Sequence, residues 1–141
     1  MAVSPITERT DVRRQPGEVL PFKLSNVKIF EGALVSVNSS GYAVNATDAS
    51  GDIFVGVADE TVDNSGGSAG DKEIKVRIGG IVNVDSEFSA AQTNVTDLVY
   101  AYDNHTVSSA ATMTNDVLVG RVVEVLSASK LRVALVTPGR A

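Results

Sequence analysis

Residues 34–62, LVSVNSSGYAVNATDASGDIFVGVADETV, decide the fold of this chain, because a second copy of the stretch follows 64 positions later. Residues 98–126, LVYAYDNHTVSSAATMTNDVLVGRVVEVL, match it at seven of 29 positions without a gap. The identical pairs are Leu34/Leu98, Val35/Val99, Ala46/Ala110, Asp52/Asp116, Val55/Val119, Gly56/Gly120 and Glu60/Glu124. Apolar residues also keep their positions where the residue type changes, so we interpret the two segments as an internal duplication.

Both copies show the alternation of apolar and polar residues that is typical of β-strands. In each copy, two short apolar runs flank a cluster of Asn, Asp, Ser or Gly, which predicts a β-hairpin. The predicted hairpin strands are residues 34–37 and 42–44 in the first copy, and residues 98–102 and 106–107 in the second. A polar connection then leads to a Val-Gly strand, in which Gly56 and Gly120 predict a bulge or a close backbone approach at equivalent places.

A strand of alternating apolar and polar residues follows each Val-Gly strand. The apolar positions are Ile74, Val76 and Ile78 in the first copy, and Leu131, Val133 and Leu135 in the second. The offset between the copies falls here from 64 to 57, which indicates a seven-residue insertion in the loop of residues 63–71. Between the copies, Gly79 and Gly80 predict a sharp turn, residues 81–84 a further strand, and residues 86–92 one helical turn.

These elements together predict an all-β fold. About eight or nine strands over 115 residues, with little helix, favour a compact antiparallel β-barrel or sandwich. Such closure also protects the Val-rich strands from pairing with other chains. A chain of 141 residues fits one domain built on a single core, which we assign to residues 25–141.

The first 24 residues predict an extended N-terminal arm. Pro5, Pro16 and Pro21 favour extended backbone in themselves and in their neighbours. The first 25 residues carry a net charge of +1, whereas the remainder carries −6. A slightly basic arm, residues 1–24, is therefore expected to precede an acidic body.

Composition excludes several classes of protein. The chain has no cysteine, which rules out disulfides, thiolate metal sites and cysteine nucleophiles. Its net charge of −5 argues against a nucleic-acid partner, because such binding depends on neutralising phosphates. The first residues lack the apolar segment of a signal peptide, and no stretch approaches the ~18 apolar residues of a membrane span. We therefore expect a soluble protein that is made in the cytosol and has no membrane partner.

No set of catalytic residues stands out. His105 is the only histidine and lies in a predicted turn, where a structural role is expected. The zinc, nucleophilic-serine and phosphate-loop signatures are absent, so we predict no catalytic residue, no cofactor and no metal site. The acidic residues Asp59, Glu60, Asp63 and Asp71 leave calcium open as a minor alternative, although their spacing matches no calcium-binding loop.

Five short motifs follow one another along the chain: G-x-LV at Gly32 to Val35, VGVADE at Val55 to Glu60, V-x-GG at Val76 to Gly80, VY-x-x-D at Val99 to Asp103, and VG-x-V at Val119 to Val122. In this order the motifs resemble the head decoration, or capsid cement, proteins of tailed bacteriophages. The resemblance covers about residues 25 to 137. It implies a small β-rich homotrimer that binds the major capsid protein on the outer face of the virion and stabilises the shell without enzymatic activity.

The arm lies outside the strongest resemblance, and we assign it the grip on the capsid. Arg9, Arg13 and Arg14 are expected to pair with carboxylates of the shell, and Val19, Leu20 and Phe22 to fill apolar grooves. A three-fold interface is expected to bury apolar residues, for which Phe54, Phe88, Tyr100 and Tyr102 are all candidates.

Two other functions stay open. A carbohydrate- or surface-binding β module would use Tyr42, Tyr100 and Tyr102 together with loop acids, and it predicts saturable sugar binding by the isolated protein. A trimeric β-barrel enzyme would need a matched acid and base in a pocket, and the sequence offers no such pair.

Overall fold

The computed structural model describes residues 19–137 and consists almost entirely of β-strands, which confirms the expected all-β class. The strands are β1 (Val19–Lys23), β2 (Lys28–Ile29), β3 (Leu34–Val37), β4 (Ala43–Asn45), β5 (Ile53–Ala58), β6 (Val62–Asp63), β7 (Glu73–Arg77), β8 (Ile81–Ser86), β9 (Leu98–Ala101), β10 (Thr106–Ser108), β11 (Leu118–Ser127) and β12 (Lys130–Leu135). Within this part of the chain the one helical element is a 3-10 turn, η1 (Gln92–Asn94). The helical turn expected over residues 86–92 is therefore wrong, because β8 continues to Ser86 and the turn begins only at Gln92.

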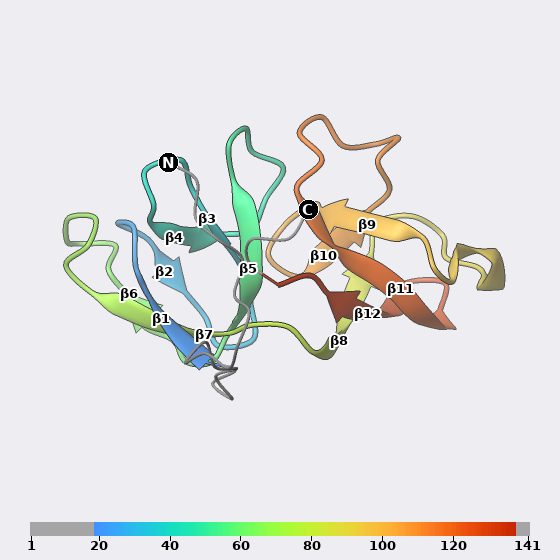
Figure 1. The fold of residues 1–141 in the computed structure, drawn as a ribbon, viewed down its shortest axis with the longest axis horizontal. Helices are drawn as coiled ribbons and strands as arrows, with labels where there is room; N and C mark the ends of the chain where they lie inside the picture. The colour runs from blue at the N-terminus through green and yellow to red at the C-terminus, as the bar shows by residue number, and fades with distance from the viewer. Residues whose placement is uncertain (1–18, 138–141) are drawn as a thin grey trace, which may run out of the picture.

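The strands form two groups that lie side by side (Figure 1). In the first half, residues 19–77, five strands form a sheet in the order β1-β7-β5-β3-β4, and β2 pairs with β6 beside it. In the second half, residues 81–135, five strands form a closed barrel in the order β10-β8-β12-β11-β9. Both predicted hairpins are confirmed, because β3 pairs with β4 and β9 with β10 in antiparallel registers.

The duplication is larger than the matching sequence segments. The β1–β7 pair has the same register as the β8–β12 pair: Val19 lies opposite Arg77 and Lys23 opposite Glu73, as Ile81 lies opposite Ala134 and Asp85 opposite Lys130. A parallel bridge between Leu24 and Ala43 joins the two ends of the first sheet, and a parallel pair between Ser86 and Val107 closes the second. Each half is thus the same five-stranded unit, and β1 is the counterpart of β8.

The body therefore begins earlier than predicted, since the end of the expected arm belongs to the sheet. Residues 19–23 form β1, and Leu24 is fully buried. The N–H of Leu24 points toward β7, because it donates to the carbonyl oxygen of Lys72. Successive residues of a strand point their N–H groups to opposite sides, so the nitrogen of Pro21, three residues earlier, faces away from β7. Proline is compatible with such an edge, because no ladder bond is lost there.

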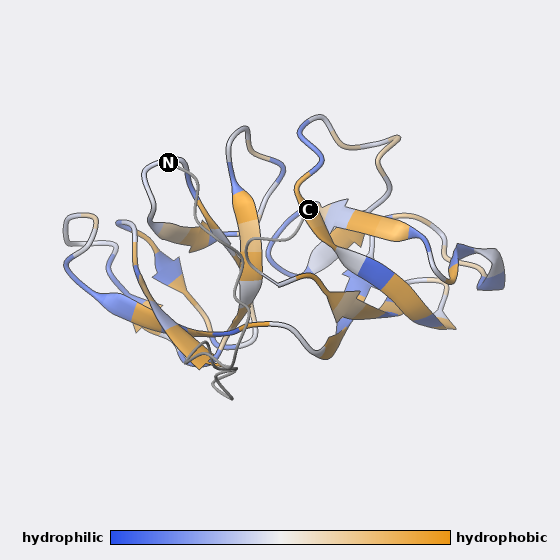
Figure 2. Ribbon diagram, in the orientation of Figure 1, coloured by the Kyte–Doolittle hydropathy of each residue, from blue (hydrophilic) through white to orange (hydrophobic). Residues whose placement is uncertain are grey.

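Each half also has its own core, so the expectation of a single core is wrong. The first core contains Leu24, Ile29, Val35, Ile74 and Val76, and the second contains Val99, Val107, Val119, Val122, Leu131 and Val133. Hydrophobic segments lie along the strands of both groups (Figure 2). Leu34, Ala46 and Phe54 of the first half pack into the second core and join the halves. Two cores form because the strands of each copy pair among themselves instead of contributing to one shared barrel.

Gly56 and Gly120 confirm the predicted close backbone approach. A Cβ atom on Gly56 would collide with the carbonyl oxygen of Arg77, and one on Gly120 with the carbonyl oxygen of Ala134. The strand register also shifts beside both glycines, as in a β-bulge. The same contact in both halves shows that the duplication is preserved at the level of backbone packing.

We predict that Gly120→Ala lowers the free energy of unfolding by about 2 to 3 kcal/mol, because a methyl group must push two strands apart. Urea denaturation of the purified protein measures this loss. Gly66→Ala is the matched control, since no atom lies within 4 Å of a Cβ built there, and its effect should stay within about 0.5 kcal/mol. Equal stability of the two variants would contradict the packing argument.

Candidate functional site

The residues assigned to the capsid-binding arm fall into two sets. Arg9, Arg13 and Arg14 lie outside the described residues. Val19, Leu20 and Phe22 lie on β1, at the edge of the first sheet. Phe22 packs partly against the first core, and Val19 is half-buried. Leu20 keeps 41% of its surface exposed, so of the three it offers the most apolar surface to a partner.

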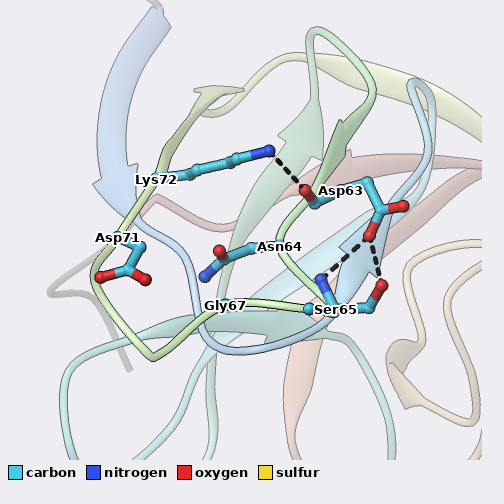
Figure 3. A pocket seen from close by; sticks show the side chains of 7 residues that line it. Asp63, Asn64, Ser65, Gly67, Asp71 and Lys72 are labelled. Carbon is cyan, nitrogen blue, oxygen red and sulfur yellow. Dashed lines mark hydrogen bonds between the residues drawn. The ribbon is translucent and has the colours of Figure 1, made fainter.

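A polar pocket lies in the insertion loop of the first half (Figure 3). The pocket, hereafter the tip pocket, has a volume of about 570 Å³. Its lining residues are Asp63, Asn64, Ser65, Gly66, Gly67, Asp71 and Lys72. The second half has only a short turn at this place, because β11 and β12 join directly through residues 128–129.

Asn64 holds this loop on the sheet. Its side chain is 2% exposed, and its amide nitrogen lies 3.0 Å from the carbonyl oxygen of Ser25 and 2.9 Å from that of Ser68, to both of which it donates. A weaker donation of 3.4 Å reaches the carbonyl oxygen of Leu24. The same carbonyl oxygens also accept backbone N–H groups, that of Ser25 from Val27, that of Ser68 from Asp71 and that of Leu24 from Gly70. The buried amide of Asn64 therefore adds a second donor and ties these segments together.

The acidic residues of this region are bonded locally and do not converge. Asp63 accepts from the backbone and hydroxyl of Ser65, bonds which lower the pKa of Asp63. Asp71 accepts from the Ser68 amide at 2.9 Å, and Asp59 pairs with Arg77 at 2.8 Å. Within residues 19–137 no group of three or more His, Cys, Asp or Glu side chains is placed to hold a metal ion. The tip pocket therefore offers a hydrogen-bonding surface and no assembled metal centre among these residues.

A second concavity, hereafter the junction groove, lies between the two halves and has a volume of about 550 Å³. It is lined by Gly51, Asp52, Ile53, Phe54, Tyr100, Asn115, Asp116, Val117, Leu118 and Val136. Residues 51–54 and 115–118 are the same segment of the two copies, so the duplication builds both walls. Sequence reasoning missed this groove, although the identical Asp52 and Asp116 were visible in the aligned copies.

Asp48 connects the halves beside this groove. Its carboxylate accepts from the Thr114 amide at 2.9 Å and from the Asn115 amide at 2.8 Å, and its carbonyl oxygen accepts from the Asn115 side chain at 3.0 Å. The two backbone N–H donors are the main cause of a lowered pKa for Asp48. The two halves are thus held by a charge-assisted contact as well as by the shared core.

The remaining singled-out side chains lie apart from both concavities or serve packing. His105 is exposed, with Nδ1 3.0 Å from an Asp103 carboxylate oxygen. Phe54 is buried in the second core, Phe88 packs partly against it, and Tyr102 is exposed. Of the four aromatic residues considered for a three-fold interface, Tyr102 presents the most surface. None of these residues forms a matched acid and base within a described pocket.

We predict that Asn64→Ala lowers the free energy of unfolding by about 2 kcal/mol, because the hydrogen bonds from the buried Asn64 amide to the carbonyl oxygens of Ser25 and Ser68 are lost. Denaturant unfolding measures the change. Ser65→Ala is the control, since this exposed hydroxyl bonds only Asp63, and it should cost less than about 0.5 kcal/mol. A larger loss in the control would refute the role assigned to Asn64.

We also predict a pH-dependent contribution from Asp48. Its pKa is lower in the folded state, so its stabilisation is present above the ordinary carboxyl value and is lost as the pH falls through the lowered pKa. Asp48→Asn should lower the free energy of unfolding by about 1 kcal/mol at pH ~7 and progressively less in acid. Unfolding measured over a pH series tests this, with the exposed Glu31→Gln as control. A difference that persists at the acid end contradicts it.

Comparison with known proteins assigns this chain to no family. No protein-family model matches the sequence, and no curated protein matches it at a significant level. Across residues 19–137, no helix has the length and apolar character needed to cross a membrane. The functional argument therefore starts from the motifs and the geometry described above.

Proposed function

We propose that this chain is a capsid decoration protein that binds the outer surface of a bacteriophage head as a homotrimer and stabilises the shell. Support comes from the ordered motifs that resemble this class and from an all-β body in which each half has its own core. A decoration protein needs a stiff body that presents attachment segments, and it needs no reactive centre.

The proposal depends most on the place where residues 1–18, hereafter the leader, join the first sheet. Residues 1–18 continue directly into β1, an outer strand of the first sheet. Five consecutive residues of β1 pair with β7, so a pull on the leader is distributed over a ladder of backbone hydrogen bonds. Arg9, Arg13 and Arg14 precede this anchor and would pair with carboxylates of the major capsid protein.

The trimer would bind by avidity. Three leaders attached to one assembly reach neighbouring capsid subunits at a high effective concentration, so each single attachment can be weak. Tyr102, which keeps 44% of its surface exposed, is the aromatic residue that we place at a contact between copies. Binding on the outer face of the virion would then resist expansion of the shell from within.

Co-sedimentation with bacteriophage shells assembled from a major capsid protein tests the proposal. The intact protein should pellet with the shells, whereas a variant lacking residues 1–18 should stay in the supernatant. The deletion stops at residue 18 because Val19–Lys23 belong to the sheet, and its circular dichroism should match that of the intact protein.

A charge variant separates the leader's arginines from its length. Replacing Arg9, Arg13 and Arg14 together by Gln should weaken shell binding at least ten-fold, because several charge-assisted contacts are lost. Replacing the exposed body arginine Arg121 by Gln is the control and should leave binding unchanged. If the intact protein fails to pellet, the decoration function is wrong; if the deletion variant still pellets, the leader's role is wrong.

A further inference from the structure

The tip pocket contains an acceptor oxygen that no donor of the described residues uses. The side chain of Asn64 is 2% exposed, and all of its hydrogen bonds are made by the amide nitrogen Nδ2. Among residues 19–137 no donor reaches the oxygen Oδ1 of the same amide. Polar atoms of buried side chains rarely lack a partner, because the loss of hydration costs free energy. An acceptor left open in a pocket therefore points to a ligand that donates a hydrogen bond.

Gly67 keeps this oxygen accessible from the pocket. A Cβ atom on Gly67 would collide with Asn64 Oδ1 and would come within 3.1 Å of Asp71 Oδ2, so both oxygens lie on the same side of Gly67. In the view of Figure 3 the Asn64 side chain lies between those of Asp71 and Asp63. Within residues 19–137 the one buried side-chain polar atom that is sealed from solvent without a partner is Ser36 Oγ, so Asn64 Oδ1 still reaches the pocket that Asn64 lines. Two acceptors are thus placed to bind neighbouring donors of one ligand.

The pocket carries both signs of charge, which favours a neutral ligand over an ion. Asp63 and Asp71 supply carboxylates, and Lys72 supplies an ammonium group. Lys72 Nζ donates to the carbonyl oxygen of Asp63 at 2.8 Å and keeps further protons to donate. A cation would be repelled by the Lys72 ammonium group, and an anion by the two carboxylates. A hydroxyl group both donates and accepts, so adjacent hydroxyls can use the acceptors and the donor of this pocket together.

An aromatic ring lies against the same loop. A Cβ atom on Gly70 would come within 3.2 Å of the Tyr42 ring. Tyr42 is one of the three tyrosines that the sequence suggested for a carbohydrate-binding module; Tyr100 lines the junction groove instead, and Tyr102 is exposed on the second half. An aromatic ring offers apolar surface beside polar groups, which suits the C–H groups of a sugar ring.

We propose that the tip pocket binds a saccharide, a neutral ligand with hydroxyl groups on adjacent carbon atoms. Asn64 Oδ1 and the Asp71 carboxylate accept hydrogen bonds from these hydroxyls, and Lys72 Nζ donates to one of them. The site belongs to the first half alone, because only a short turn at residues 128–129 joins β11 and β12 in the second. This inference does not rest on capsid binding, and its test involves no shells.

A chemical-shift titration of the intact, isotope-labelled protein tests the proposal. The probes are the methyl glycosides of glucose, galactose, mannose and N-acetylglucosamine, each raised into the tens-of-millimolar range. At least one glycoside should shift the amide signals of residues 63–72 saturably and should leave those of residues 115–118 in the junction groove unmoved. Glycerol at the same concentrations is the control for hydroxyl groups in general. No saturable shift with any glycoside, or equal shifts with glycerol, overturns the proposal.

Two variants identify the hydrogen bonds to the sugar. D71N and K72M should each weaken the affinity for the glycoside at least about five-fold, because each removes one charged partner of a hydroxyl group. E73Q is the matched control, since Glu73 is an exposed neighbour on β7 that does not line the pocket, and its affinity should be unchanged. Amide signals outside residues 63–72 report whether each variant stays folded. Unchanged affinity in either D71N or K72M, or an equal loss in E73Q, overturns the proposed contacts.

Calcium chloride is the second probe, because the acidic residues of this region are the alternative ligands for a cation. The glycoside titrations contain EDTA, and the expected shifts at residues 63–72 appear without any cation. Shifts with calcium and none with a glycoside would assign the pocket to a metal ion and overturn the saccharide. Glycoside binding that appears only after calcium is added would overturn the direct contacts of Asn64 and Asp71.

Discussion

The close approach of two backbones at Gly56 and at Gly120 is the constraint on which both halves depend. At each glycine the chain passes so close to a carbonyl oxygen of the next strand, that of Arg77 or Ala134, that no side chain fits. The β-bulge beside each glycine bends β5 and β11, which lets five short strands curl around a small core. Without this bend, each sheet would stay open and expose a Val-rich face.

The two cores are joined because residues of the first half contact the second half. The side chain of Phe54, from the first half, packs in the second core. The carboxylate of Asp48 accepts hydrogen bonds from two backbone N–H groups in the loop of the second copy. These contacts are not symmetric, since the position equivalent to Asp48 is Thr112. The contact between the halves is therefore made by residues that the two copies do not share.

Local patterns predicted much of the fold and little of the site. The hairpins β3–β4 and β9–β10 were predictable because turn residues and apolar alternation lie within a few positions of each other. The role of β1 was not, because VLPFK and its counterpart IVNVD share no identical residue, and β1 pairs with a strand some fifty residues away. Of the predicted arm residues, Val19, Leu20 and Phe22 proved to be parts of a sheet, whereas Arg9, Arg13 and Arg14 lie outside the described residues.

The sequence by itself determined the strand class, the hairpin turns, the duplication and the need for glycine at positions 56 and 120, because these follow from side-chain period and local backbone preference. Only the tertiary structure decided that the second half closes into a barrel of its own and that residues 51–54 meet residues 115–118 across a groove. Such choices depend on pairing between distant strands, such as Val19 with Arg77, and on the packing of one half against the other. The apolar alternation of a single strand is compatible with many of these pairings, so long-range geometry has to select among them.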